Sequence, residues 1–169
     1  MTSTKPLHIL LIEDTPLHQN SAQLQFENKE LYQLTLAHNY EHAKQYLIQS
    51  EKSPYDILLT DLMMPKGGRD TMSHKGIEYI FDLLPYGFPL AFLAAKQNIP
   101  YISIVTDINH HDHPMSACID NLSDAYWNDN TSNASLYHIN NSLLGIFHAP
   151  FLKDGAKDWM KVLETIRQK

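Results

Sequence analysis

The sequence predicts an α/β protein built on a doubly wound, five-stranded parallel sheet. Five short apolar segments alternate along the chain with segments in which apolar residues recur at helical spacing. Such an alternation is typical of parallel strands joined by crossover helices. The length of 169 residues and the 43% share of hydrophobic residues suit one globular domain spanning 1–169.

The five apolar segments have the length and composition of buried strands. They cover residues 7–12, 31–37, 57–60, 99–105 and 143–147. The first and third are nearly continuous runs of Leu and Ile, as expected for parallel strands that helices cover on both faces.

The segments between the strands show helical spacing. We expect helices over residues 15–26, 40–50, 76–84, 90–96 and 158–168, and a short helix from Pro114 within 110–122. Pro16 suits the first turn of a helix, whereas the prolines of segment 85–89 separate two helices because proline disrupts a helix interior. Trp159 and the Phe and Leu residues from Phe81 to Phe92 are expected to lie in the core.

Two polar stretches interrupt this pattern as insertions, one near 66–75 and one near 107–142. The first contains Gly67-Gly68 and predicts an exposed, flexible loop. Within the second, residues 123–142 are rich in Asn, Asp and Ser, which predicts an irregular segment.

Composition excludes several classes of protein. The net charge is −6 and no run of Lys or Arg occurs, so nothing favours direct binding to nucleic acid. No apolar stretch is long enough to span a bilayer, and the N-terminus lacks the apolar core of a signal peptide. Cys118 is the single cysteine and provides no intramolecular disulfide. A cytoplasmic location is therefore expected.

Acidic and hydroxyl side chains follow three of the predicted strands. Glu13 and Asp14 come directly after the first strand, Asp61 after the third and Thr106 after the fourth. In a parallel sheet these strand ends open onto one edge, where ligands bind. Carboxylate oxygens are the ligands that Mg²⁺ prefers, so the sequence predicts a Mg²⁺ site at this edge.

Three segments resemble the receiver domain of two-component response regulators. Leu10-Leu-Ile-Glu-Asp-Thr-Pro16 is similar to the acidic-pair turn of that family, and Leu58-Leu-Thr-Asp-Leu-Met-Met-Pro65 to its phosphoacceptor segment. Ile102-Ser-Ile-Val-Thr106 is similar to the strand that ends in the Thr/Ser switch residue. The resemblance extends loosely over the whole chain, with two insertions, and implies the flavodoxin-like receiver fold.

The resemblance also implies a role for each residue at the strand ends. Asp61 would be the phosphoacceptor and Thr106 the switch hydroxyl that senses the phosphoryl group. Glu13, Asp14, Asp61 and the backbone carbonyl of Met63 would hold Mg²⁺. Such a metal offsets the repulsion between Asp61 and an incoming dianionic donor.

The chain departs from the receiver pattern after the fifth predicted strand, where the family has a Lys followed by a Pro. Pro150 is matched, but Ala149 occupies the Lys position. Lys153, Lys157 and His148 are the candidates to supply a cation instead, although no motif supports any of them. Without that ammonium, the salt bridge that couples phosphorylation to the switch would be lost.

Asp107 is a second departure, because it follows Thr106 where the family usually has a small residue. An extra carboxylate there would oppose a phosphoryl group or enlarge a cation site. Asp107 and Ala149 together leave open an alternative, a degenerate receiver that acts as a phosphorylation-independent protein interaction module.

The loop after the fourth predicted strand concentrates further metal-binding side chains. Three imidazoles and two carboxylates lie within seven residues: Asp107, His110, His111, Asp112 and His113. These groups suit Zn²⁺, so a second metal site made by Asp107, His110, His111 and His113 is a further hypothesis, and with it a small metal-dependent hydrolase. The spacing matches no recognised zinc motif, and a polar loop explains it equally well. We therefore expect no enzyme activity beyond autophosphorylation from a phosphodonor.

The receiver resemblance also implies partners. A histidine kinase or phosphotransfer protein would supply the phosphoryl group, and a downstream protein would bind the phosphorylated form. A homodimer is a further option. We expect neither nucleic acid nor a membrane to be a direct partner.

Overall fold

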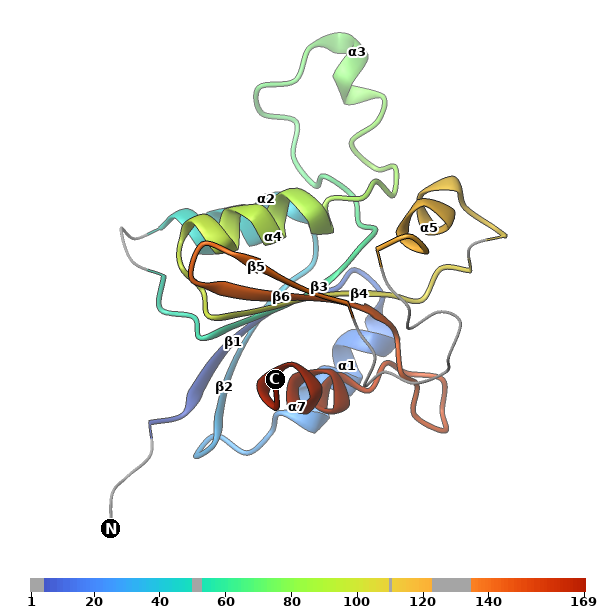
Figure 1. Cartoon of the computed structure of the whole chain (residues 1–169). Coiled ribbons are helices and arrows are strands. Elements are labelled where there is room, and N and C mark those ends of the chain that lie inside the picture. The colour runs from blue at the N-terminus through green and yellow to red at the C-terminus, as the bar shows by residue number, and fades with distance from the viewer. Residues whose placement is uncertain (1–4, 50–52, 110, 123–134) are drawn as a thin grey trace.

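A computed structural model describes residues 5–49, 53–109, 111–122 and 135–169, and shows an α/β fold with one central sheet (Figure 1). The strand order is β2-β1-β3-β4-β6-β5. The strands are β1 (Leu7–Ile12), β2 (Tyr32–Ala37), β3 (Ile57–Asp61), β4 (Tyr101–Thr106), β5 (Ser135–Ile139) and β6 (Ser142–His148). All neighbouring pairs except β5 with β6 run parallel, so the predicted doubly wound sheet is confirmed.

Helices cover both faces of the sheet (Figure 1). The described helices are α1 (Pro16–Gln25), α2 (Tyr40–Ile48), α3 (His74–Ile77), α4 (Gly87–Lys96), α5 (Pro114–Ile119) and α7 (Trp159–Arg167). Apolar residues of α2 and α4 form one buried cluster with the sheet, and those of α1 and α7 form another on the opposite face. No helix in the described part of the chain combines the length and apolarity needed to cross a membrane.

The sheet has one more strand than the sequence predicted. Residues 135–139 were expected to be irregular, but they form β5, which pairs antiparallel with β6 through the register Ile139↔Ser142. The connecting residue Asn140 has a φ of 53°, a backbone conformation that Asn adopts more readily than most residues. The Asn- and Ser-rich composition therefore belongs partly to a hairpin turn. Residues 123–134 of the predicted insertion lie outside the described segments.

The segment between β3 and α4 also differs from the prediction. The helix expected over 76–84 is wrong for most of its length, because α3 ends at Ile77 and turns follow. Residues 66–86, which we call the arm, project from the body of the molecule in Figure 1. Pairing between Met64 and Leu84, with N···O distances of 3.1 and 3.2 Å, closes the base of the arm.

The burial of side chains in the arm and in α4 differs from two predictions. Lys66 was expected in a flexible loop, but it is buried and its ammonium pairs with Glu41 at the start of α2. Phe81 and Phe92 were expected in the core, but they are 73% and 57% exposed. The core prediction for Trp159 is confirmed, since its side chain is fully buried.

Helix α4 begins in direct contact with the end of β3. The Gly87 amide donates to the Leu62 carbonyl at 2.9 Å, and a Cβ at Gly87 would lie 2.5 Å from the Asp61 carbonyl oxygen. Because that oxygen belongs to the backbone, only glycine permits this approach. Gly87 therefore helps to fix the backbone that carries Asp61.

We predict that Gly87→Ala lowers the free energy of unfolding by about 1–3 kcal/mol, because the added methyl overpacks a rigid contact. Gly76→Ala is the control, since its Cβ would meet only the flexible Met72 side chain. Chemical denaturation of both variants checks this. Equal stability of the two variants would contradict the assigned packing.

Candidate functional site

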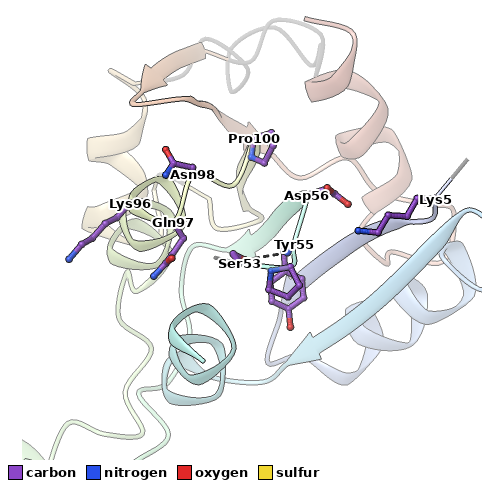
Figure 2. A pocket seen from close by; sticks show the side chains of 9 residues that line it. Lys5, Ser53, Tyr55, Asp56, Lys96, Gln97, Asn98 and Pro100 are labelled. Atoms are coloured by element: carbon purple, nitrogen blue, oxygen red, sulfur yellow. Dashed lines mark hydrogen bonds between the residues drawn. The ribbon is translucent and has the colours of Figure 1, made fainter. Parts of the chain in front are cut away.

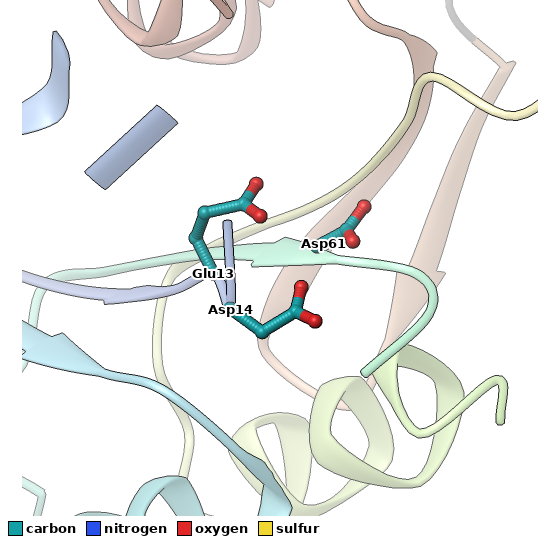
Figure 3. A group of neighbouring side chains, drawn as sticks. All are labelled: Glu13, Asp14 and Asp61. Atoms are coloured by element: carbon teal, nitrogen blue, oxygen red, sulfur yellow. The ribbon is translucent and has the colours of Figure 1, made fainter. Parts of the chain in front are cut away.

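Three carboxylates meet at the C-terminal edge of the sheet (Figure 3). Glu13 and Asp14 follow β1, Asp61 ends β3, and these strands are neighbours with Ile12 opposite Thr60. One oxygen of each carboxylate lies within 4.8 Å of the others. The edge rule for parallel sheets thus brings together the residues that the sequence singled out.

Local hydrogen bonds hold these carboxylates in place. The Glu13 amide donates to the Ala37 carbonyl at 3.0 Å, which continues the β1–β2 pairing beyond the strand. Glu13 Oε1 accepts from the Thr15 amide at 2.9 Å, and Asp61 Oδ1 accepts from the Leu62 amide at 2.8 Å. Glu13 is fully buried and Asp61 nearly so, so both need a compensating charge.

Lys157 supplies that compensating charge. Its Nζ lies 2.8 Å from Glu13 Oε2, 3.0 Å from Asp61 Oδ1 and 3.6 Å from Asp107 Oδ1. The Lys157 side chain is 1% exposed, which makes this a buried charge network rather than a surface ion pair. Of the three candidate cations Lys153, Lys157 and His148, it is Lys157 that places an ammonium beside Asp61, whereas Ala149 lies in the core.

A tight loop between β6 and α7 delivers Lys157 to the site. Phe151 forms an antiparallel bridge with Lys157, and the Asp158 amide donates to the Pro150 carbonyl at 2.8 Å. The turn of this loop contains Gly155, whose φ of 82° suits glycine. The loop folds back on itself, so a lysine seven residues after Pro150 reaches the strand ends.

Helix α1 clamps the backbone of Lys157. The Lys157 amide donates to His18 Nδ1 at 3.2 Å, and its carbonyl accepts from Ser21 Oγ at 3.2 Å and Gln25 Nε2 at 3.0 Å. Two residues further on, Trp159 donates from its indole to the His18 carbonyl at 3.1 Å. No motif in the sequence pointed to His18, because only the folded loop brings residue 157 against α1.

Two residues of the β4 end complete the site. Asp107 contacts Lys157 through Oδ1, and its Oδ2 lies 3.4 Å from His18 Nε2. The Thr106 side chain is buried at the end of β4, and its hydroxyl accepts from the Ile108 amide at 3.3 Å. Met63, whose backbone carbonyl is the fourth predicted Mg²⁺ ligand, is buried two residues after Asp61.

The electrostatic environment shifts three pKa values. Burial raises the pKa of Asp61 to about 7, and Glu13 and Asp107 add to the effect although Lys157 opposes it. Burial and the Glu13 charge also raise the pKa of Asp14. Burial alone would lower the pKa of Lys157, but Asp61, Glu13 and Asp107 outweigh it and raise that pKa. The site therefore carries an excess of negative charge that a cation would relieve.

The donor set fits a hard divalent cation. Glu13, Asp14 and Asp61 offer oxygen ligands only, which Mg²⁺ prefers, and a few carboxylates suffice because that ion retains waters. Both Glu13 oxygens already accept hydrogen bonds, so Asp14 and Asp61 have more capacity for direct contact with a metal.

The predicted second metal site gains no support from the described residues. His110 lies outside them, and their potential metal-binding groups contain neither Asp107, His111 nor His113. Asp107 contacts Lys157 and His18, while His113 Nδ1 accepts from the Met115 amide at 3.1 Å and so caps α5. A Zn²⁺ site in this loop is not supported.

A hollow of about 880 Å³ lies at the opposite, N-terminal edge of the sheet (Figure 2). Its lining includes Lys5, Asp56 and Lys96. The Asp56 carboxylate accepts from the His8 amide at 2.9 Å, which ties β3 to β1. Asp56 therefore has a structural role in this hollow. Ligands of open α/β sheets bind at the carboxyl ends of the strands, so the acidic edge remains the candidate site.

The chain has the receiver-domain fold, and its similarity to one solved receiver domain supports this assignment. The non-phosphorylated HemR receiver domain from Leptospira biflexa shares 14% identity over 95% of this chain and 93% of that chain, with a TM-score of 0.52. A chain in the complex of the P1 domain of CheA3 with CheY6 from R. sphaeroides shares 12% over 98% and 100%, with a TM-score of 0.49.

The response regulator protein TrrA from Thermotoga maritima, in complex with Mg(2+)-BeF, shares 16% identity over 96% of this chain and 97% of that chain, with a TM-score of 0.46. No protein-family model matches the chain, and no curated protein matches it. At these identities the likeness concerns the fold, and the site must be argued from this chain's own residues.

We predict that Lys157→Met lowers the free energy of unfolding at neutral pH by about 3–5 kcal/mol, because it leaves buried carboxylates without their ammonium. Mg²⁺ should restore part of the loss. Lys153→Met is the control, since Lys153 is exposed. Urea denaturation with and without Mg²⁺ checks this, and equal stability of both variants would show that Lys157 is not the compensating charge.

The raised pKa of Asp61 predicts a pH dependence of stability in the presence of a chelator. The folded protein retains the Asp61 proton up to about pH 7, whereas an unfolded carboxyl loses it near pH 4. The wild type should therefore lose stability relative to Asp61→Asn as pH rises between these values, by at most about 1.4 kcal/mol per pH unit. A difference that stays constant with pH would contradict the shift.

Proposed function

We propose that this protein is a two-component response regulator receiver that accepts a phosphoryl group on Asp61. The phosphorus–donor bond would break as an Asp61 carboxylate oxygen bonds to phosphorus, and the leaving group would retain the bonding electrons. Oδ1 already accepts from the Leu62 amide and Lys157, which favours Oδ2 as the nucleophile. The observation that carries this proposal is the placement of Lys157 Nζ between Glu13 and Asp61.

In this proposal each charged residue has a defined task. Glu13 and Asp14, with Asp61 and the Met63 carbonyl, would hold Mg²⁺, which when bound would neutralise charge on the phosphoryl oxygens. Lys157 remains paired with Asp61 during the reaction, and the Thr106 hydroxyl turns from the Ile108 amide toward the phosphoryl group. The acidic edge and the fold support these tasks.

The proposed phosphodonor is a histidine kinase or a phosphotransfer protein, and the proposed output is altered binding to a downstream protein. The similar fold of a chain in the CheA3 P1–CheY6 complex suggests the kind of encounter involved. A cytoplasmic location and a homodimer remain predictions.

A degenerate receiver remains the alternative, and Asp107 is the observation that favours it. Its carboxylate adds negative charge beside Asp61 and contacts the same ammonium. In that case the protein would bind partners without accepting a phosphoryl group. The presence of Lys157 at Asp61 weighs for the phosphorylated receiver.

Acetyl phosphate with Mg²⁺ separates the two functions. We predict that intact mass spectrometry detects the gain of one phosphoryl group, and that Asp61→Asn abolishes it because the carboxylate nucleophile is gone. The exposed Asp82 gives the control, Asp82→Asn, which should gain the group as the wild type does. No gain by the wild type would favour the degenerate receiver, and a gain by Asp61→Asn would overturn the assignment of Asp61.

A further inference from the structure

Asp107 and Asp61 share the same ammonium. Lys157 Nζ lies 3.0 Å from Asp61 Oδ1 and 3.6 Å from Asp107 Oδ1. The Asp107 side chain is 33% exposed, whereas Lys157 and Asp61 are buried. Asp107 can therefore move into solvent at lower cost than Asp61, which is the last residue of the inner strand β3.

His18 ties this charge pair to helix α1. Because His18 Nδ1 accepts from the Lys157 amide, a neutral imidazole carries its proton on Nε2 and faces Asp107 Oδ2 at 3.4 Å. One buried side chain thus bonds the backbone of Lys157 and lies beside the Asp107 carboxylate. The network connects the residue after Thr106 to α1.

A phosphoryl group on Asp61 would change this balance. It replaces the single negative charge of the Asp61 carboxylate with a dianion next to Lys157. A carboxylate that shares the same ammonium is then repelled and loses its share of the cation. Since Asp61 is fixed and Asp107 is partly exposed, Asp107 is the residue that would yield.

We propose that Asp107 is a positioning residue that competes with the phosphoryl group for Lys157 and thereby limits how strongly the site retains it. This inference rests on the proposed phosphoryl acceptance at Asp61. In the resting protein Asp107 and His18 hold Lys157 in place. On phosphorylation Asp107 releases Lys157, and the start of the loop after β4 moves with it.

Beryllofluoride, an analogue of the phosphoryl group on a carboxylate, tests the competition in the presence of Mg²⁺. Asp107→Asn removes the charge and retains an oxygen that can accept from His18. We expect this variant to bind beryllofluoride about tenfold more tightly than the wild type, the size of one neighbouring-charge interaction in a partly buried site. Asp107→Ser should give the same direction of change, and Asp82→Asn, the charge-matched control, should bind as the wild type does.

The outcomes separate this inference from the proposed function. Equal affinity of Asp107→Asn and the wild type, with normal phosphorylation of both, overturns the competition and leaves the receiver function standing. If Asp107→Asn is phosphorylated and binds beryllofluoride while the wild type does neither, Asp107 excludes the phosphoryl group completely, which supports the competition. Absence of both activities in both proteins overturns the proposed function and this inference with it.

Discussion

The contact between the Lys157 ammonium and the buried carboxylates is the interaction on which the candidate site depends. Glu13 and Asp61 are buried at the ends of adjacent central strands, and ionised carboxylates are costly there without a counter-charge. A buried ion pair adds little net stability over an apolar core. Its retention here therefore points to a task that needs charge at this position.

Asp61 and Lys157, the two partners in this contact, are held in place by different parts of the structure. Sheet pairing and the backbone contact between Gly87 and the end of β3 fix Asp61, whereas the loop after β6 and three side chains of α1 fix Lys157. The carboxylate thus belongs to the rigid sheet and the ammonium to a loop attached to the sheet. Changes in charge at the site are more easily absorbed on the loop side and at Asp107 than at Asp61.

The carboxylate edge was predictable from sequence, whereas the choice of Lys157 among its three candidates was not. Short apolar runs and the parallel-sheet rule were sufficient to place Glu13, Asp14 and Asp61 together, because the residues directly follow their strands. Lys157 reaches the site through a hairpin-like loop that contains a positive φ at Gly155, so no motif in the sequence could select it over Lys153 or His148. Strand β5 was missed for a related reason, since turn residues dominate the composition around it.

The charge balance of the site explains why two cations are needed for the proposed chemistry. Glu13, Asp14, Asp61 and Asp107 bring four carboxylates around the single positive charge of Lys157. Burial is the main cause of the raised pKa of Asp61, and the charges of Glu13 and Asp107 add to it. A phosphoryl group replaces the single negative charge of the Asp61 carboxylate with about two negative charges at the same point. Lys157 alone cannot offset that total, whereas Lys157 with a divalent cation can come close once Asp107 turns to solvent. Because Asp107 is partly exposed, it is the carboxylate of this site that can move away from Lys157 most easily.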